Sequence, residues 1–396
     1  MAAAASELDI VFLESHDGGS HRDFRLGLMS HSRHRYRALT LPPRFWKWRM
    51  RGAALWFADR LRRQPPPCDL LLATSLLNVA DLRGLLPPPL DRRPLVLYMH
   101  ENQLTYPLSP QEEFDFHFGF TNIISCLAAD LVVFNSTYHR ERFLDALPLY
   151  LNRMPEAVPA GIRPRLEAKT RVRPVGLRRS PVAASARAVW RGGPCEPQAG
   201  PPWPRDGRRP VLLWNHRWEF DKRPDLFAGT VERLLAAGLD FTVVLAGDSR
   251  HQEAVFAPLA ERLGERCLYF GYAADRERYA ALLAQADIVV SCAEQEYFGI
   301  AVAEAVHAGC YPVLPRREVY PSLYGPLCRG RHFYDTPADL DRLLADLIRG
   351  EGCGHMCSLA VDMDAFCWDQ LVASYDELLL DAAAMGGKAP AEREPA

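Results

Sequence analysis

The chain has 396 residues, of which 48% are hydrophobic and 24% charged, and its formal net charge is −2. This length exceeds one typical domain, and no apolar run approaches the roughly twenty residues of a membrane span. The amino terminus lacks a basic segment followed by a long apolar stretch, and the ten cysteines follow no regular framework. These features predict a soluble two-domain protein with reduced thiols, no secretory signal and no membrane attachment.

The first half of the chain alternates short apolar runs with helical patterns. Strands of the buried parallel kind are predicted at residues 8–13, 70–74, 95–100 and 131–135, with helices such as 21–30 and 115–129 between them. This order predicts a Rossmann-like domain, whose functional loops follow the carboxyl ends of the strands. Gly18 and Gly19 follow the first strand, where an acceptor or a sugar could approach the backbone.

A basic and aromatic tract covers residues 31–51, which contain seven cations and no acid. The cations are Arg33, Arg35, Arg37, Arg44, Lys47, Arg49 and Arg51, and the interleaved aromatic residues are Tyr36, Phe45, Trp46 and Trp48. Cations that bind phosphates beside rings that stack on bases are typical of a nucleic-acid surface. The alternative is a loop and an amphipathic helix whose aromatic residues belong to the core.

Repeated Pro, Gly, Ala and Arg residues then mark residues 180–208, which have the composition of a mobile insertion. The second half alternates again, with strands predicted at residues 211–215, 241–246, 268–270, 287–291 and 311–314. This pattern predicts a second Rossmann-like domain. Gly247 follows its second strand, where a nucleotide base could rest against the backbone.

Two acids flank a turn after the strand at residues 287–291: Glu296 precedes Phe298 and Gly299, and Glu304 follows them. If a helix begins near Gly299 and Ile300, its unpaired N–H groups and positive dipole end favour a phosphate. Glu304 would then lie more than a turn along, where an acid can bind the two hydroxyls of a ribose. The alternative is an ordinary amphipathic helix with solvated acids.

Arg217 and Lys222 follow the strand at residues 211–215, on the loop that opens the next helix. Two cations at the carboxyl end of a parallel strand are well placed to neutralise a diphosphate. Alternatively they are surface charges that pair with Glu219 and Asp221.

This pattern of Arg217, Lys222, Glu296 and Glu304 resembles the retaining family 4 glycosyltransferases of the GT-B fold. Further segments are similar to the tRNA-queuosine alpha-mannosyltransferases within that group. They are residues 17–21 (Asp-Gly-Gly-Ser-His), 44–51 (Arg-Phe-Trp-Lys-Trp-Arg-Met-Arg), 100–107 (His-Glu-Asn-Gln-Leu-Thr-Tyr-Pro), 134–139 (Phe-Asn-Ser-Thr-Tyr-His) and 214–222 (Trp-Asn-His-Arg-Trp-Glu-Phe-Asp-Lys). The resemblance covers most of the chain, apart from residues 180–208 and the last dozen.

The resemblance implies an α/β GT-B protein with two Rossmann-like domains that face each other across a cleft. It divides the chain into an N-terminal acceptor (tRNA) domain at 1–178, an insertion at 179–208, a donor domain at 209–361, a C-terminal helix at 362–385 that crosses back to the first domain, and a disordered tail at 386–396. One departure is Arg178, where the relatives tend to carry an acid.

The resemblance also implies transfer of mannose from GDP-mannose to the cyclopentene diol of queuosine in a tRNA anticodon, with tRNA-Asp as the expected acceptor. Arg217, Lys222 and the N–H groups after Phe298 would stabilise the leaving diphosphate without a metal. Glu296 would contact the mannose hydroxyls, Glu304 the ribose, and His100 the region of the reacting bond. We therefore expect no metal, no cofactor and no obligate protein partner, and action in the cytoplasm, with the nucleus as a second location.

Some alternatives stay open. Glu101 and Asn102 could orient the acceptor diol. Cys353, His355 and Cys357 do not have the spacing of a zinc knuckle. The chain could be another family 4 transferase that uses UDP-glucose or UDP-N-acetylglucosamine, or an RNA-binding protein that kept the fold without catalysis.

Overall fold

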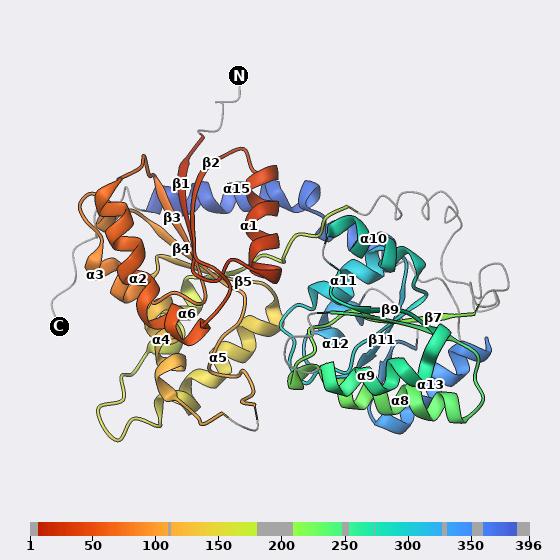
Figure 1. Ribbon diagram of the computed structural model, residues 1–396. Coiled ribbons are helices and arrows are strands. Elements are labelled where there is room, and N and C mark those ends of the chain that lie inside the picture. Colours follow the sequence, from red (N-terminus) through yellow and green to blue (C-terminus); the bar gives the residue numbers. More distant parts are fainter. Residues whose placement is uncertain are drawn as a thin grey trace. The chain divides into compact units, whose positions relative to one another are not determined.

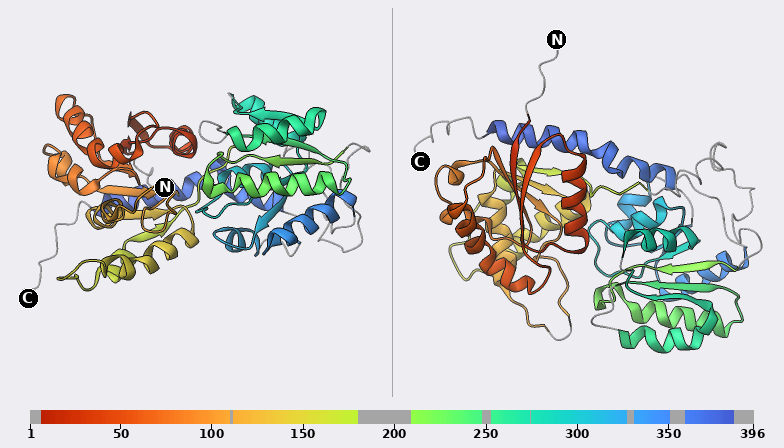
Figure 2. Two further views of the ribbon diagram at one scale, coloured as in Figure 1. Left: turned by 60° about the horizontal axis from the view of Figure 1, so that its bottom comes forward. Right: turned by 45° about the horizontal axis from the view of Figure 1, so that its top comes forward.

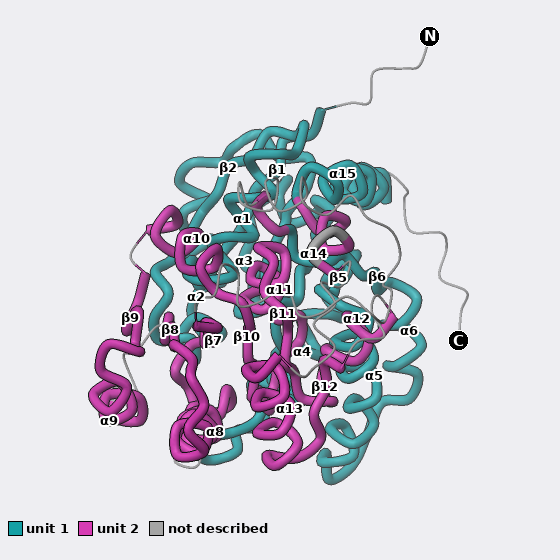
Figure 3. The backbone as a smooth tube through the Cα atoms, turned by 90° about the vertical axis from the view of Figure 1, so that its right-hand side faces the viewer, with its two compact units in different colours: residues 1–176, 368–396 teal, residues 177–367 magenta. Residues whose placement is uncertain are grey.

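The computed structural model describes residues 7–109, 112–179, 209–247, 253–273, 275–326, 331–350 and 359–385. The chain forms two compact units (Figures 1 and 3): unit 1 comprises residues 1–176 and 368–396, and unit 2 residues 177–367. The predicted insertion at 180–208, the predicted tail at 386–396 and the segment from Cys353 to Cys357 lie outside the described residues.

Unit 1 is built on a six-stranded parallel sheet in the order β2-β1-β3-β4-β5-β6. Its strands are β1 (Asp9–Glu14), β2 (Arg35–Thr40), β3 (Leu70–Thr74), β4 (Leu95–Met99), β5 (Leu131–Phe134) and β6 (Thr170–Val172). Its helices are α1 (Gly19–His31), α2 (Trp46–Arg63), α3 (Val79–Leu85), α4 (Phe116–Ala128), α5 (Thr137–Leu151), α6 (Ile162–Ala168) and α15 (Trp368–Met385). The four predicted strands are confirmed, and each is a run of almost wholly buried apolar residues, as expected of a parallel sheet covered on both faces.

The closing helix α15 packs beside α1 in unit 1 (Figure 2). It begins at Trp368, six residues later than predicted, because residues 363–366 form a separate 3-10 turn. The indole of Trp368 lies against two glycines: a Cβ at Gly27 would be 1.9 Å from its Nε1, and one at Gly176 would be 2.2 Å from its Cδ2. Only glycine allows this close packing, and the aromatic stripe of α15 is core.

Unit 2 contains a second six-stranded parallel sheet, in the order β12-β11-β10-β7-β8-β9. Its strands are β7 (Val211–Trp214), β8 (Thr242–Ala246), β9 (Cys267–Gly271), β10 (Ile288–Val290), β11 (Tyr311–Pro315) and β12 (Phe333–Tyr334). Its helices include α8 (Pro224–Ala236), α9 (Glu253–Leu263), α10 (Arg276–Gln285), α11 (Ile300–His307), α12 (Tyr320–Tyr324), α13 (Pro337–Arg349) and α14 (Leu359–Asp362). The order changes direction at β7, so the loops after β7 and β10 meet at the switch point where α/β sheets bind ligands.

The basic tract at residues 31–51 differs from its predicted form. Residues 35–40 form β2, an edge strand, rather than a loop. Arg35 pairs with Asp9, and the Tyr36 hydroxyl donates to Ser32 Oγ at 3.1 Å. Only the residues from Trp46 onward form the start of an amphipathic helix, α2. Among the described residues, no helix has both the length and the apolar character needed to span a membrane.

Candidate functional site

The centre of the candidate donor site is the ammonium group of Lys222, in a 3-10 turn (Phe220–Lys222) after β7. Its Nζ donates to the backbone oxygen of Gln295 at 2.6 Å and contacts Asp221 Oδ2 and Glu296 Oε2, each at 3.1 Å. Lys222 is 6% exposed and Asp221 is fully buried. The structure therefore brings together Lys222 and Glu296, two of the predicted residues, across 73 positions of intervening sequence.

Glu296 also shapes the turn that begins α11. Its Oε1 accepts the N–H of Gly299 at 3.1 Å, while its Oε2 contacts Lys222. Gly299 has a φ of +79°, a left-handed conformation that favours glycine, and it directly precedes Ile300, the first residue of the helix. Phe298 is buried, with its ring centroid 5.9 Å from that of Phe366. The helix starts where it was predicted, although one of its N–H groups is already satisfied by Glu296.

Arg217 lies on the loop after β7 with its side chain 54% exposed, and its Nη1 contacts Glu219 Oε1 at 3.0 Å. Thus both ion pairs of the alternative reading, Arg217–Glu219 and Lys222–Asp221, are present in the structure. They do not exclude a phosphate site, because both cations still lie at the carboxyl edge of the sheet.

Glu304, on α11, is paired with a residue that the sequence reasoning did not identify. Its Oε1 lies 3.0 Å from Nη1 of Arg276, the first residue of α10. Beside this pair, the side-chain amide of Asn215 donates to the Tyr279 hydroxyl at 3.0 Å and to the backbone oxygen of Ala301 at 2.7 Å. The end of β7 is thereby tied to α10 and α11. One sequence feature could have identified Arg276: it is the first residue of the helix that follows β9, so it too comes shortly after the end of a strand.

Gly247, immediately after β8, has a steric reason to be glycine. A Cβ there would lie 2.0 Å from the backbone oxygen of His216 and 2.7 Å from Nε1 of Trp218. Burial, reinforced by the charge of Lys222, lowers the pKa of His216 to about 4, so its imidazole is neutral. The loops after β7 and β8 therefore touch along their backbones.

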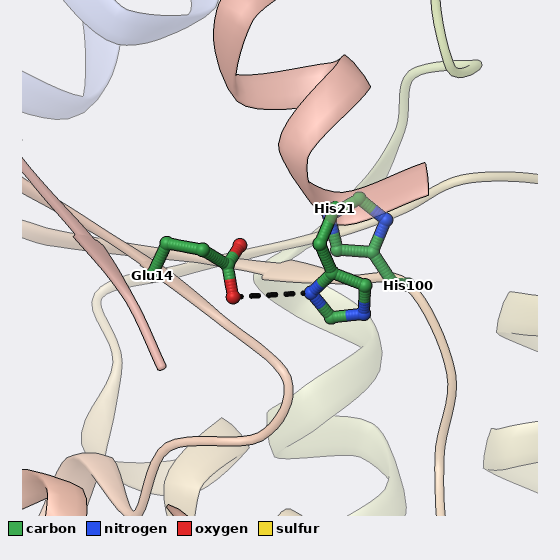
Figure 4. A group of neighbouring side chains, drawn as sticks. All are labelled: Glu14, His21 and His100. Carbon is green, nitrogen blue, oxygen red and sulfur yellow. Dashed lines mark hydrogen bonds and ion pairs between the residues drawn. The ribbon is translucent and has the colours of Figure 1, made fainter. Parts of the chain in front are cut away.

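The predicted site residues of unit 1 lie in and around a second cluster of side chains, part of which is drawn in Figure 4. His21, near the start of α1, lies between two carboxylates: its Nδ1 is 3.1 Å from Glu14 Oε1 and its Nε2 is 3.0 Å from Glu101 Oε2. Burial alone would lower the pKa of His21, but the two carboxylates outweigh it and raise the pKa to about 10. Burial likewise opposes ionisation of Glu101, yet the charge and hydrogen bond of His21 hold its pKa well below its usual range. The cluster is therefore a protonated imidazole between two carboxylates.

His100, at the carboxyl end of β4, stacks on this imidazolium with ring centroids 4.0 Å apart (Figure 4). Burial, and then the positive charge of His21, hold the pKa of His100 well below its usual value. Its Nε2 is buried and has no hydrogen-bond partner among the described residues. His100 is thus a neutral hydrogen-bonding group at neutral pH and cannot serve there as a cationic acid.

The loops around this cluster have structural roles. Gly18 caps α1 with extended backbone, and a Cβ on it would lie 2.4 Å from Pro43. Gly19 has a φ of +50° with open space around it. Asn102 is fully buried and accepts the N–H groups of Leu104 and Thr105. The side chain of Asn102 therefore holds its own loop, and its role in orienting an acceptor stays a prediction. Glu101 keeps a partly exposed carboxylate, with 20% of its side chain open to solvent.

Two groups of side chains in the described parts of the chain lie close enough to hold a metal ion: Glu14, His21 and His100, and separately His307, Asp364 and Cys367. In the first, both ring nitrogens of His21 are committed to carboxylates. That arrangement is the one expected of a structural imidazolium, which has no lone pair to offer a metal.

Comparison with known proteins identifies the family. Residues 9–177 match the family model described as tRNA-queuosine alpha-mannosyltransferase N-terminal, and residues 199–359 match glycosyl transferases group 1. The chain is also 36% identical, over 345 residues, to a tRNA-queuosine alpha-mannosyltransferase of Drosophila melanogaster, covering 86% of this chain and 87% of that protein. This chain belongs to the tRNA-queuosine alpha-mannosyltransferase family. It is accordingly a glycosyltransferase, and the resemblance drawn from its motifs is confirmed.

Solved structures confirm the GT-B architecture of this mannosyltransferase family member. A sucrose-phosphate synthase from Thermosynechococcus elongatus matches with a TM-score of 0.65 at 17% identity, covering 96% of this chain and all of the other. The HepE protein of Anabaena, solved with UDP and glucose, matches with a TM-score of 0.59 at 17% identity, covering 94% of this chain and 99% of that one. At such identities the likeness concerns the fold alone.

Proposed function

We propose that this enzyme transfers mannose from GDP-mannose to the cyclopentene diol of queuosine in tRNA-Asp, with retention of configuration. The family supports the reaction, and one observation supports the donor site in particular. Lys222 and Glu296 contact each other where the loops after β7 and β10 meet, beside the start of α11. Cations and a helix start together favour a diphosphate at this position.

Donor binding requires an exchange of partners at Lys222. An ammonium group has three N–H donors, and in this structure Nζ already has three oxygen neighbours. Glu296, whose side chain is 19% exposed, is the partner that can move, because Asp221 is fully buried and the third oxygen belongs to the backbone. A phosphate oxygen would take the place of Glu296, and the released carboxylate could then accept hydroxyl groups of the mannose.

The second ion pair supports a ribose site at Glu304. Glu304 keeps 14% of its side chain exposed beside Arg276. Its carboxylate can accept hydrogen bonds from two vicinal hydroxyls, and Arg276 would hold it in position. Gly247 would allow the base to approach the backbone of the loop after β8.

In the chemical step, the bond between the anomeric carbon and the diphosphate oxygen breaks, and an acceptor hydroxyl oxygen bonds to the same face of that carbon. Arg217 and Lys222 would stabilise the negative charge that develops on the leaving diphosphate, whose oxygen takes the acceptor proton. No metal or other cofactor is part of this proposal. The proposed role of His100, which is neutral and buried, is to contribute a hydrogen bond rather than a proton.

The test uses the purified protein, GDP-mannose and queuosine-containing tRNA-Asp, with nucleoside mass spectrometry as the readout. We expect a hexose on queuosine, absent when the tRNA carries unmodified guanine or when UDP-glucose replaces the donor. Arg217→Ala should lower kcat/KM about 100-fold, the usual effect of removing one group that stabilises developing charge. Arg233→Ala is the matched control, because Arg233 is a surface cation of the same unit that pairs with Asp341 on another helix. Equal transfer from UDP-glucose, or full activity of Arg217→Ala, would contradict the proposal.

A further inference from the structure

The start of α2 exposes two large aromatic side chains. Phe45 is 68% exposed and Trp48 is 74% exposed, and exposed apolar side chains that lie together commonly mark binding sites. Phe45 adopts a left-handed backbone conformation with a φ of +57°, which is unfavourable for a bulky residue. The intervening Trp46 points the other way and packs on Phe118 of α4, with ring centroids 5.1 Å apart. The core contact of Trp46 thus anchors the turn that presents the other two rings.

Cations lie beside aromatic rings of this segment and of α4. The guanidinium carbon of Arg44 lies 5.8 Å from the centroid of Phe45, and that of Arg51 lies 5.4 Å from the centroid of Phe118. The positive charge of Lys47 is partly offset by Glu112, because its Nζ lies 2.9 Å from Glu112 Oε1. Residues 31–51 include no acid, so the exposed rings at the start of α2 are flanked by positive charge.

The neighbouring start of α4 repeats this combination. Phe114 and Phe116 are 46% and 48% exposed, and the guanidinium carbon of Arg153 lies 4.2 Å from the centroid of Phe114. The Trp46–Phe118 contact and the Lys47–Glu112 ion pair hold the two helix starts together (Figure 1). Exposed rings beside cations therefore occur on two adjoining segments of unit 1.

We propose that the surface formed by Arg44, Phe45, Trp48 and Arg51, called here the α2 stacking surface, binds the unpaired bases of an RNA loop. Bases stack on aromatic faces whatever their sequence, and the flanking guanidinium groups bind the phosphates. The charge of this segment favours RNA as the occupant, because residues 31–51 contain seven cations and no acid, and the phosphates of an RNA loop are complementary to that charge. The inference rests on the proposed function, since that function requires an RNA acceptor.

The test compares two substitutions at one exposed position. Trp48→Phe keeps an aromatic face, and Trp48→Leu keeps apolar area without one. We expect Trp48→Leu, and likewise Phe45→Leu, to raise the Kd for queuosine-containing tRNA-Asp about 5- to 100-fold, and Trp48→Phe to stay within about threefold of wild type. Arg51→Gln should reduce the slope of log affinity against log salt concentration by roughly 0.7 to 1, the value for one lost phosphate contact.

Three readouts separate the outcomes. The Kd for GDP-mannose, measured by calorimetry without tRNA, should be unchanged in every variant, because the α2 stacking surface belongs to unit 1 and the candidate donor residues to unit 2. Unchanged tRNA affinity in both leucine variants would overturn the inference and favour a protein partner for this surface. If wild-type protein binds tRNA in an aromatic-dependent way but transfers no sugar, the proposed function fails and the RNA surface stands.

Discussion

Lys222→Met should destabilise unit 2, and this effect on folding has to be measured before any effect of the substitution on catalysis can be interpreted. The substitution removes the cation that contacts fully buried Asp221 and largely buried Glu296. Breaking a buried ion pair by deleting one partner typically costs about 3–5 kcal/mol, because the other charge is left without compensation. For a unit of this size, about 2–4 °C of melting temperature corresponds to 1 kcal/mol, so we expect a fall of roughly 6–20 °C.

Thermal and urea unfolding followed by tryptophan fluorescence measure this effect, because Trp214 and Trp218 are fully buried reporters inside unit 2. The triple variant Lys222→Met, Asp221→Asn, Glu296→Gln removes all three charges and should recover most of the loss. Arg233→Ala, which breaks an exposed pair, should cost less than about 1 kcal/mol. A Lys222→Met protein that melts within 2 °C of wild type would refute the reasoning, and Lys222 would then be a clean probe of phosphate binding.

Three further predictions follow from other contacts. The pKa of His21 is raised to about 10, so the stabilisation of the fold by its imidazolium is complete below a pH of about 6.5 and is lost as the pH rises through 10. Urea unfolding should therefore show a stability that falls over that range in the wild type, and a flatter profile in His21→Gln. Gly247→Ala should lower the free energy of unfolding by about 1–3 kcal/mol or more and weaken GDP-mannose binding in calorimetry. Gly52→Ala is the control: Gly52 lies on a helix with open space around it, so the substitution should raise the free energy of unfolding by about 0.5–1 kcal/mol. Equal effects of the two substitutions would contradict the steric argument. Arg276→Ala should raise the KM for GDP-mannose about tenfold, because Glu304 loses the partner that holds it. The melting temperature should change little, since a partly exposed pair of this kind is worth about 1 kcal/mol. An unchanged KM would remove Arg276 from the site.

Much of the fold could be predicted because buried parallel strands are short apolar runs with helical patterns between them. Two strands of unit 1 were not predicted, the three-residue β6 and β2. The sequence of β2, Arg-Tyr-Arg-Ala-Leu-Thr, has alternating polar residues because it is an edge strand with partly exposed side chains. Its arginines made it resemble the rest of the basic tract. In fact Arg35 is held by Asp9 on the adjacent strand β1, a pairing that only the sheet order reveals.

Residues of the candidate site could be predicted where their placement follows from their position after a strand. They could not be predicted where their placement depends on a side chain that is far away in the sequence. Lys222 and Glu296 could be assigned because each follows a strand whose carboxyl end lies at the binding edge of a parallel sheet. The imidazolium of His21 could not, because its carboxylates come from β1 and from the end of β4, 80 residues away in the case of Glu101. Nothing in the spacing of these residues indicates that the topology places them together.

The two units share one electrostatic arrangement: acids hold their charged neighbours in place before any ligand is present. In unit 2, an empty site of cations alone would be destabilised by repulsion, and its side chains would have to be ordered when the donor arrives. Glu296 and Glu304 prevent this by pairing with Lys222 and Arg276, and Glu296 remains exposed enough to exchange its partner while Arg276 holds Glu304 in position. Fully buried Asp221 cannot exchange, so it keeps Lys222 in position while the other partners change. The arrangement therefore suits the proposed donor, because a sugar nucleotide supplies phosphate oxygens for the cations and hydroxyls for the acids, whereas inorganic diphosphate supplies no hydroxyls.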